Sequence, residues 1–130
     1  MAASGPMNLF SLLDAAAVRF PARGAVFSGD REVLSYAALR QRALALAAYL
    51  KHRFRPGDRV ALASENRPEY VELLFGIWAA GMVAVPINAK LHPREIGQIL
   101  DDCAAAASSH RRRSPVSSFA PRPRLFATAR

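Results

Sequence analysis

The sequence has few of the features that point directly to a function. A single cysteine, Cys103, excludes an internal disulfide and any multi-cysteine metal site. The first residues, Met1 to Pro6, lack the basic start and apolar stretch of a signal peptide. The longest uncharged run, Leu73 to Ile87, is shorter than the ~20 apolar residues that span a bilayer. We therefore expect no membrane span and a cytoplasmic location.

Acidic residues are missing from the end of the chain. Up to Cys103 there are 12 basic and 10 acidic residues, whereas residues 104–130 hold six arginines and no acid. The net charge of +8 therefore belongs mainly to this tail, and nucleic-acid binding by the rest of the chain is not expected. Arginine contacts to nucleic acid or to an anionic surface remain an alternative function for the tail. The arginines are at Arg111, Arg112, Arg113, Arg122, Arg124 and Arg130.

The first third of the chain has helix and hairpin patterns. Asn8 can cap a helix whose apolar residues recur at spacings of three and four up to Phe20. Two short apolar runs then flank Gly29-Asp30, a pair suited to the tight turn of a β-hairpin. Ser35 can cap a second helix that reaches about Arg53.

The central part of the chain predicts a βαβ unit. Val60–Ala63 and Met82–Val85 are apolar on both faces, as in strands covered from both sides. Between them Pro68 suits the first position of a helix that is apolar nearly all round and that Gly81 ends. The two strands are therefore expected to be parallel. A last helix begins at Pro93 and places Ile96, Ile99, Leu100 and Cys103 on one face.

The pattern changes after Cys103. Ala, Arg, Ser and Pro make up 21 of the 27 residues from Ala104 to Arg130, which leaves no periodic apolar face. We predict a flexible N-terminus at residues 1–7, an α/β domain at 8–103 and a disordered tail at 104–130. All four residue types have GC-rich codons, so we favour a non-selected tail that arose from a shifted reading frame or a splice junction.

Several segments resemble the AMP-forming adenylating enzymes, in order and without gaps. Leu34-Ser35-Tyr36 resembles the family's first core motif, and Ala80-Gly81 to Val85-Pro86-Ile87-Asn88 resembles its second. Pro56-Gly57-Asp58-Arg59-Val60-Ala61, Asn66-Arg67-Pro68-Glu69-Tyr70, Leu91-His92-Pro93-Arg94-Glu95-Ile96 and Ile99-Leu100-Asp101-Asp102-Cys103 match further stretches. The Val-Pro-Ile-Asn form favours acyl-CoA synthetases over peptide-synthetase adenylation domains.

The resemblance implies a partial N-terminal subdomain with a β-hairpin and a parallel βαβ unit. Complete members use ATP, Mg²⁺ and CoA to convert a carboxylic acid, such as a fatty acid, into an acyl-adenylate and then an acyl-CoA. Their Ser/Thr/Gly-rich phosphate loop and lysine-bearing lid have no counterpart in these 130 residues. We therefore assign no catalytic, cofactor-binding or metal residue and expect the chain alone to be inactive. The alternative is a non-catalytic interaction module that binds a full-length homologue or another partner.

Individual side chains have simpler interpretations than catalysis. Lys90 reads as a solvated loop residue, and no two of the histidines have metal-ligand spacing. Glu69 and Glu72 fall near the predicted start of a helix, where the helix dipole stabilises negative charge. This ordinary explanation weakens the case for a functional acid cluster that would also include Glu65. The helical spacing of Phe75 and Trp78 indicates core rather than a ligand cage. The histidines are His52, at a helix end, His92, a helix-cap candidate, and His110.

Overall fold

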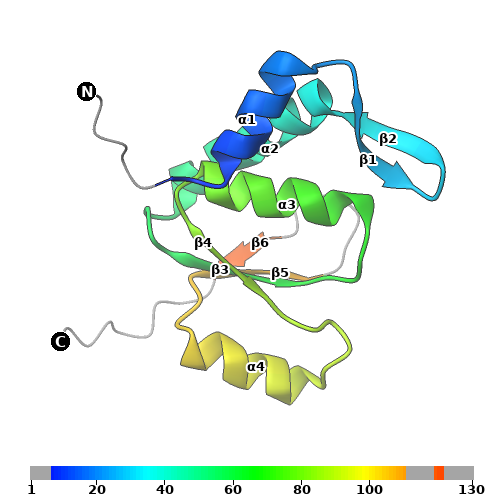
Figure 1. Ribbon diagram of the computed structural model, residues 1–130. Coiled ribbons are helices and arrows are strands. Elements are labelled where there is room, and N and C mark those ends of the chain that lie inside the picture. Colours follow the sequence, from blue (N-terminus) through cyan, green and yellow to red (C-terminus); the bar gives the residue numbers. More distant parts are fainter. Residues whose placement is uncertain (1–6, 111–118, 122–130) are drawn as a thin grey trace.

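The described part of the chain forms two sheets and four helices (Figure 1). The structure is a computed structural model that describes residues 7–110 and 119–121. In chain order the elements are α1 (Phe10–Arg19), β1 (Gly24–Ser28), β2 (Arg31–Ser35), α2 (Tyr36–Arg53), β3 (Arg59–Ala63), α3 (Pro68–Ala79), β4 (Val83–Pro86), α4 (Pro93–Asp102), β5 (Ala107–His110) and β6 (Phe119–Pro121).

Local signals set the first four elements. The Asn8 side chain accepts a hydrogen bond from the Phe10 amide at 2.9 Å, at the start of α1. Strands β1 and β2 pair antiparallel around Gly29, whose φ of 62° is strained for other residues. Ser35 Oγ accepts from the Ala38 amide at 3.2 Å and caps α2 as the sequence predicts. Of the apolar residues predicted to form one face of α1, Leu13 and Ala17 are buried, whereas Leu9 and Leu12 are exposed.

The βαβ unit is confirmed. Strands β3 and β4 are parallel neighbours, with Arg59 opposite Val83 and Leu62 opposite Pro86. Gly81 ends the connecting helix α3 with a φ of 72°, and its amide donates to the Trp78 carbonyl at 2.9 Å. Within α3 only Glu69 is exposed, as expected for a helix that is buried nearly all round.

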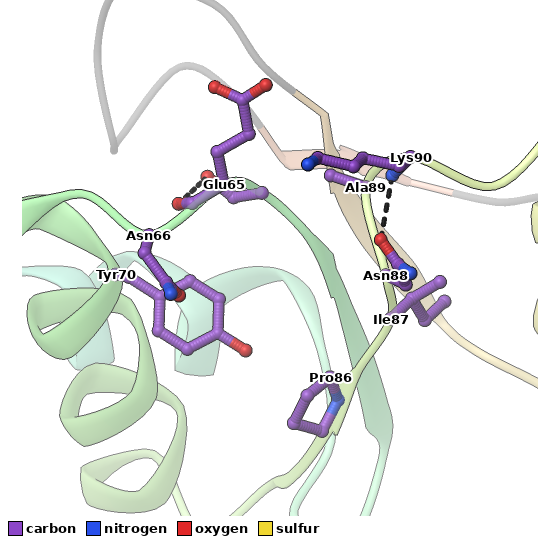
Figure 2. Close-up of a pocket in the computed structure, with 9 residues that line it drawn as sticks. Glu65, Asn66, Tyr70, Pro86, Ile87, Asn88, Ala89 and Lys90 are labelled. Carbon is purple, nitrogen blue, oxygen red and sulfur yellow. Dashed lines mark hydrogen bonds between the residues drawn. The ribbon is translucent and has the colours of Figure 1, made fainter.

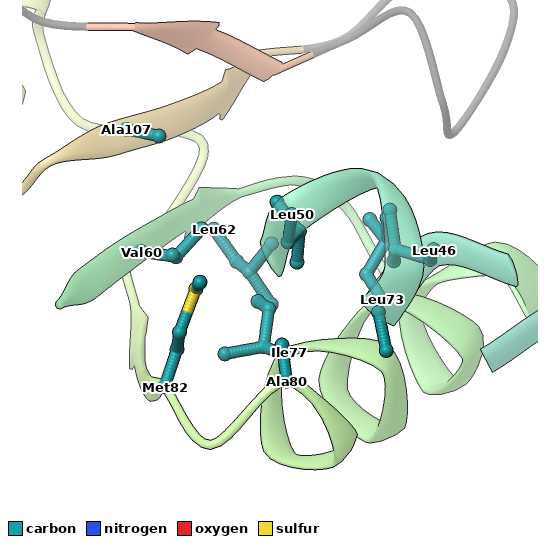
Figure 3. Packing of buried hydrophobic residues seen from close by; sticks show 10 residues of the cluster. Leu46, Leu50, Val60, Leu62, Leu73, Ile77, Ala80, Met82 and Ala107 are labelled. Atoms are coloured by element: carbon teal, nitrogen blue, oxygen red, sulfur yellow. The ribbon is translucent and has the colours of Figure 1, made fainter. Parts of the chain in front are cut away.

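Helices cover both faces of the four-stranded sheet. Helix α3 lies on one face with α2 behind it, and α4 lies on the other (Figure 1). Figure 3 shows the first core, in which Leu46 and Leu50 of α2 and Ile77 of α3 gather beside Val60 and Leu62 of β3. The alternate residues of β3 point to the other face of the sheet and belong to a second core, which α4 covers. This second core contains Ala61, Ala63, Ile87, Leu100 and Ala105.

The prediction of a disordered segment beginning at Ala104 is wrong for the part of it that the structure describes. Ala107–His110 forms β5, which pairs parallel with β3, and β6 pairs antiparallel with β5. Backbone hydrogen bonds, rather than an apolar pattern, place this segment: the Ala106 amide donates to the Arg59 carbonyl at 2.8 Å. Small side chains let the chain pass beside β3, where Ala107 is fully buried. The remaining residues of the predicted tail lie outside the described part.

Candidate pocket at the carboxyl ends of β3 and β4

A pocket of about 620 Å³ lies where the parallel strands β3 and β4 end. Its walls are the loop that follows β3, the first turn of α3 and the loop that follows β4 (Figure 2). Ligands of open α/β sheets bind outside the carboxyl ends of the strands, which makes this pocket the candidate site. The lining residues are Ser64, Glu65, Asn66, Tyr70, Pro86, Ile87, Asn88, Ala89 and Lys90.

Short-range hydrogen bonds shape the two loops. The Ile87 amide donates to the Leu62 carbonyl at 2.8 Å, which extends the β3–β4 ladder to the pocket floor. Beyond it Asn88 Oδ1 accepts from the Lys90 amide at 2.9 Å, forming an Asx turn that directs Lys90 across the pocket (Figure 2). On the opposite wall Ser64 Oγ donates to the Glu65 carbonyl at 3.2 Å.

The pocket offers hydrogen-bonding groups and one charge of each sign. Glu65 and Lys90 are both exposed and stand on opposite walls, so neither neutralises the other. Asn66 and Asn88 add amides, and Tyr70, in the first turn of α3, adds a hydroxyl. These groups can bind a polar or anionic ligand, but they include no nucleophile with an adjacent base. Across residues 7–110 and 119–121, no three His, Cys, Asp or Glu side chains are grouped to hold a metal ion.

The structure brings together two of the side chains considered from the sequence and separates the others. Lys90 and Glu65 both line the pocket. The sequence alone predicted a solvated loop residue at Lys90 and no pocket. His52 is exposed in the last turn of α2, and His110 ends β5. His92 caps α4: its Nδ1 accepts from the Arg94 amide at 3.2 Å, while its own amide donates to Glu95 at 2.9 Å.

The aromatic pair belongs to the packing of α3, as the sequence indicates. The rings of Phe75 and Trp78 lie edge to face with centroids 5.3 Å apart. Phe75 also packs against the cluster formed by α1, the hairpin and α2. Sequence reasoning missed Asn66, Tyr70 and Asn88 as pocket residues. Their position directly after two buried strands was the available signal.

Glu72 differs from the sequence interpretation. It lies beyond the first turn of α3, is 3 % exposed and faces α2. Burial raises the pKa of its carboxyl group, Arg42 opposes this rise, and Glu69 adds to it. The Arg42 Nε lies 3.4 Å from Glu72 Oε2, an oxygen without a hydrogen-bond partner in the described structure. Glu72 is thus part of the α2–α3 interface and not of the pocket.

Comparison with known proteins identifies the family. The model of the AMP-binding enzyme family matches residues 13–121. A long-chain-fatty-acid–CoA ligase of Salmonella typhimurium is 40 % identical over 102 residues, which cover 77 % of this chain and 18 % of the relative. A feruloyl-CoA synthase of an Amycolatopsis species is 42 % identical over 78 residues, covering 59 % of this chain and 16 % of that protein.

Solved structures show the same fold. The N-terminal domain of FACL13 from Mycobacterium tuberculosis superposes with a TM-score of 0.73 at 31 % identity, covering 79 % of this chain and 27 % of that one. The N-terminal subdomain of NpsA from Klebsiella oxytoca has a TM-score of 0.72 at 30 % identity, covering 80 % and 27 %.

The fold and the family match together define part of an N-terminal subdomain of an adenylate-forming enzyme. The chain belongs to the AMP-binding enzyme family. It spans about 18 % of the length of the curated ligases that it matches. Within the described residues, no helix is long and apolar enough to cross a bilayer.

Proposed function

We propose that this chain is the N-terminal segment of an ATP-dependent carboxylate–CoA ligase and that it is inactive alone. The family match over residues 13–121 carries this proposal, supported by the acyl-CoA ligases among its relatives. The phosphate loop and lid expected of a complete enzyme are missing from the 130 residues. The reaction consumes ATP and CoA, so the proposal includes a cytoplasmic location.

In this proposal the segment supplies a scaffold and one binding wall. The β3–α3–β4 unit presents its pocket at the carboxyl ends of the strands, and Lys90 is the pocket's cation. ATP and CoA both carry phosphates, and an exposed ammonium group attracts such anions. The residues that would transfer the acyl group come from other parts of a complete ligase, with ATP and Mg²⁺ supplying the adenylation chemistry.

Reconstitution tests this function. The chain is mixed with a fatty-acid–CoA ligase of the family that lacks the segment equivalent to residues 8–110. We expect no acid-dependent pyrophosphate exchange from the chain alone and measurable exchange from the mixture. Exchange by the chain alone would contradict inactivity. Association of the two pieces without activity would favour the non-catalytic interaction module.

A matched pair of substitutions tests the role of the pocket. In the reconstituted mixture Lys90→Gln is expected to raise the KM for ATP or CoA about 10- to 150-fold, since a charge-assisted contact contributes about 1.5–3 kcal/mol. Arg94→Gln changes the charge equally on the exposed side of α4 and leaves both constants unchanged. Equal effects of the two substitutions on KM would contradict the proposal that Lys90 binds ATP or CoA.

A further inference from the structure

The chain contains two lysines, Lys51 and Lys90, and they occupy different surroundings. Both side chains are exposed, and neither forms an ion pair with a carboxylate of the residues that the structure describes. Lys51 lies in the last turn of α2, next to Arg53. Lys90 lies in the loop that follows β4 and lines the pocket. The two amines therefore have the same chemistry, and only one of them has a cavity beside it.

Hydrogen bonds fix the backbone that carries Lys90. Asn88 Oδ1 accepts from the Lys90 amide at 2.9 Å, and the Asn88 carbonyl accepts from the Leu91 amide at 3.2 Å. Just before this turn the Ile87 side chain is buried in the second core. Figure 2 shows the Lys90 side chain extending from its own wall toward the wall that carries Glu65. The amine is thus directed across the pocket.

The pocket combines the groups that an activated acyl compound would need. Its volume of about 620 Å³ is that of a small-molecule site and can hold part of a nucleotide. Asn66 and Tyr70 offer hydrogen-bond donors for phosphate or carbonyl oxygens. Among the lining residues Glu65 carries the one carboxylate, and it can accept the proton that the Lys90 ammonium must lose to become a nucleophile.

We propose that Lys90 is a site of acylation by acyl-CoA thioesters. The Lys90 ammonium first gives a proton to the Glu65 carboxylate. The uncharged amine then attacks the thioester carbonyl, so that the bond from Nζ to the carbonyl carbon forms and the carbon–sulfur bond breaks. CoA leaves as a thiol, taking up the second proton that the nitrogen loses, and an amide remains on Lys90. The inference rests on the proposed function, in which the pocket binds CoA and acyl-CoA is the product.

Neighbouring charge alone gives acyl-CoA no reason to prefer Lys90. Arg53 and Arg55 follow Lys51 in the chain, whereas the charged residue facing Lys90 across the pocket is Glu65. An anion drawn by charge would therefore react at Lys51 at least as readily, and a preference for Lys90 requires binding in the pocket. Acylation also removes the pocket's cation. The product of the proposed reaction would thereby weaken further binding of phosphate-bearing ligands.

Acetylation of the full chain tests the proposal, with Lys51 as the internal control. The chain is incubated with acetyl-CoA, and its chymotryptic peptides are followed by mass spectrometry. We expect Lys90 to be acetylated about tenfold faster than Lys51, a small part of what holding two reactants together can give. Excess ATP is expected to remove the difference by occupying the pocket. Acetyl phosphate, an acyl donor without a nucleotide, is expected to acetylate both lysines at similar rates.

A matched pair of carboxylate variants tests the proton acceptor at saturating acetyl-CoA. Glu65→Gln is expected to slow acetylation of Lys90 about tenfold and to leave Lys51 unchanged. Glu69→Gln removes an exposed carboxylate of α3 that does not line the pocket, and is expected to change neither rate. Equal slowing of Lys90 in the two variants would overturn the role of Glu65. Circular dichroism verifies that both variants fold.

Equal rates at Lys51 and Lys90 with acetyl-CoA overturn the proposal, and so does a preference for Lys90 that persists in excess ATP. The reconstitution experiment separates this inference from the proposed function. Pyrophosphate exchange in the mixture without a preference for Lys90 overturns the acylation site alone. A preference for Lys90 without exchange supports the acylation site and counts against the ligase function.

Discussion

At the residue scale, the contact between Glu72 and Arg42 leads to two predictions about the stability of the fold. The Glu72 side chain is 4 % exposed, whereas the Arg42 side chain that faces it is 49 % exposed. Arg42→Ala leaves this charge without its counterion and is expected to lower the free energy of unfolding by about 1–3 kcal/mol. Arg40→Ala is the matched control, because the Arg40–Asp14 pair is exposed and contributes at most about 1 kcal/mol. Urea unfolding compares the two, and equal losses would contradict the special position of Glu72.

The raised pKa of Glu72 also predicts how stability depends on pH. Because burial raises the pKa in the folded state, the folded protein binds the proton more tightly than the unfolded chain. The contribution of Glu72 to stability therefore improves as pH falls through the folded-state pKa, until the unfolded carboxyl is protonated too. Glu72→Gln is expected to be more stable than the parent at neutral pH, with the difference shrinking in mild acid. Urea unfolding at both pH values measures it, and a difference independent of pH would refute the assignment.

At the element scale, α2 and α3 approach closely at Gly76. A Cβ atom there would lie 2.5–3.0 Å from Leu46 Cδ2, Cγ and Cβ, so the helices would have to separate. Gly76→Ala is expected to destabilise the fold by about 1–3 kcal/mol despite its better helix propensity. In α4, Gly97→Ala meets no atom within 4 Å and is expected to stabilise by about 0.5–1 kcal/mol. Thermal unfolding of both variants tests the contrast; a stabilised Gly76→Ala would mean the helices lie further apart.

At the scale of the whole molecule, the last strands decide where the domain ends. Strand β5 covers the second edge of β3, and Ala107 belongs to the first core. A chain that stops at Cys103 is therefore expected to lose cooperative unfolding and to aggregate through the open edge of β3. A chain that stops at Pro121 keeps β5 and β6 and is expected to remain monomeric. Light scattering and thermal melts distinguish them, and two equally stable chains would restore the boundary at Cys103.

The composition of β5 gives the reading-frame hypothesis a structural test. Ser108 and Ser109 are only 4 % and 3 % exposed, in a strand that lies between β3 and β6. Such a parallel strand usually carries Val, Ile or Leu, because both of its faces are covered. We expect resequencing of the gene beyond the Cys103 codon to reveal, in another frame or a nearby exon, an apolar strand followed by a Ser/Thr/Gly-rich loop ending in Pro-Lys. If neither is present, the interaction module becomes the better explanation.

The sequence by itself determined most of the elements and the family. Caps at Ser35 and His92, the turn at Gly29 and the helix end at Gly81 act within a few residues, so local pattern predicts them. The run Val60–Ala63 is apolar on both faces, and this pattern likewise predicted a strand covered by helices on both sides.

Three further features of the molecule were decided only by the tertiary structure. The burial of Glu72, the pocket around Lys90 and the place of β5 depend on segments far apart in the sequence. Glu72 has the local pattern of a helix start and is buried only because α2 crosses at Gly76. Strand β5 has no apolar alternation, and its backbone pairs with β3 because the sheet offers an open edge there. Such contacts are set by distance in space, which spacing along a single chain does not encode.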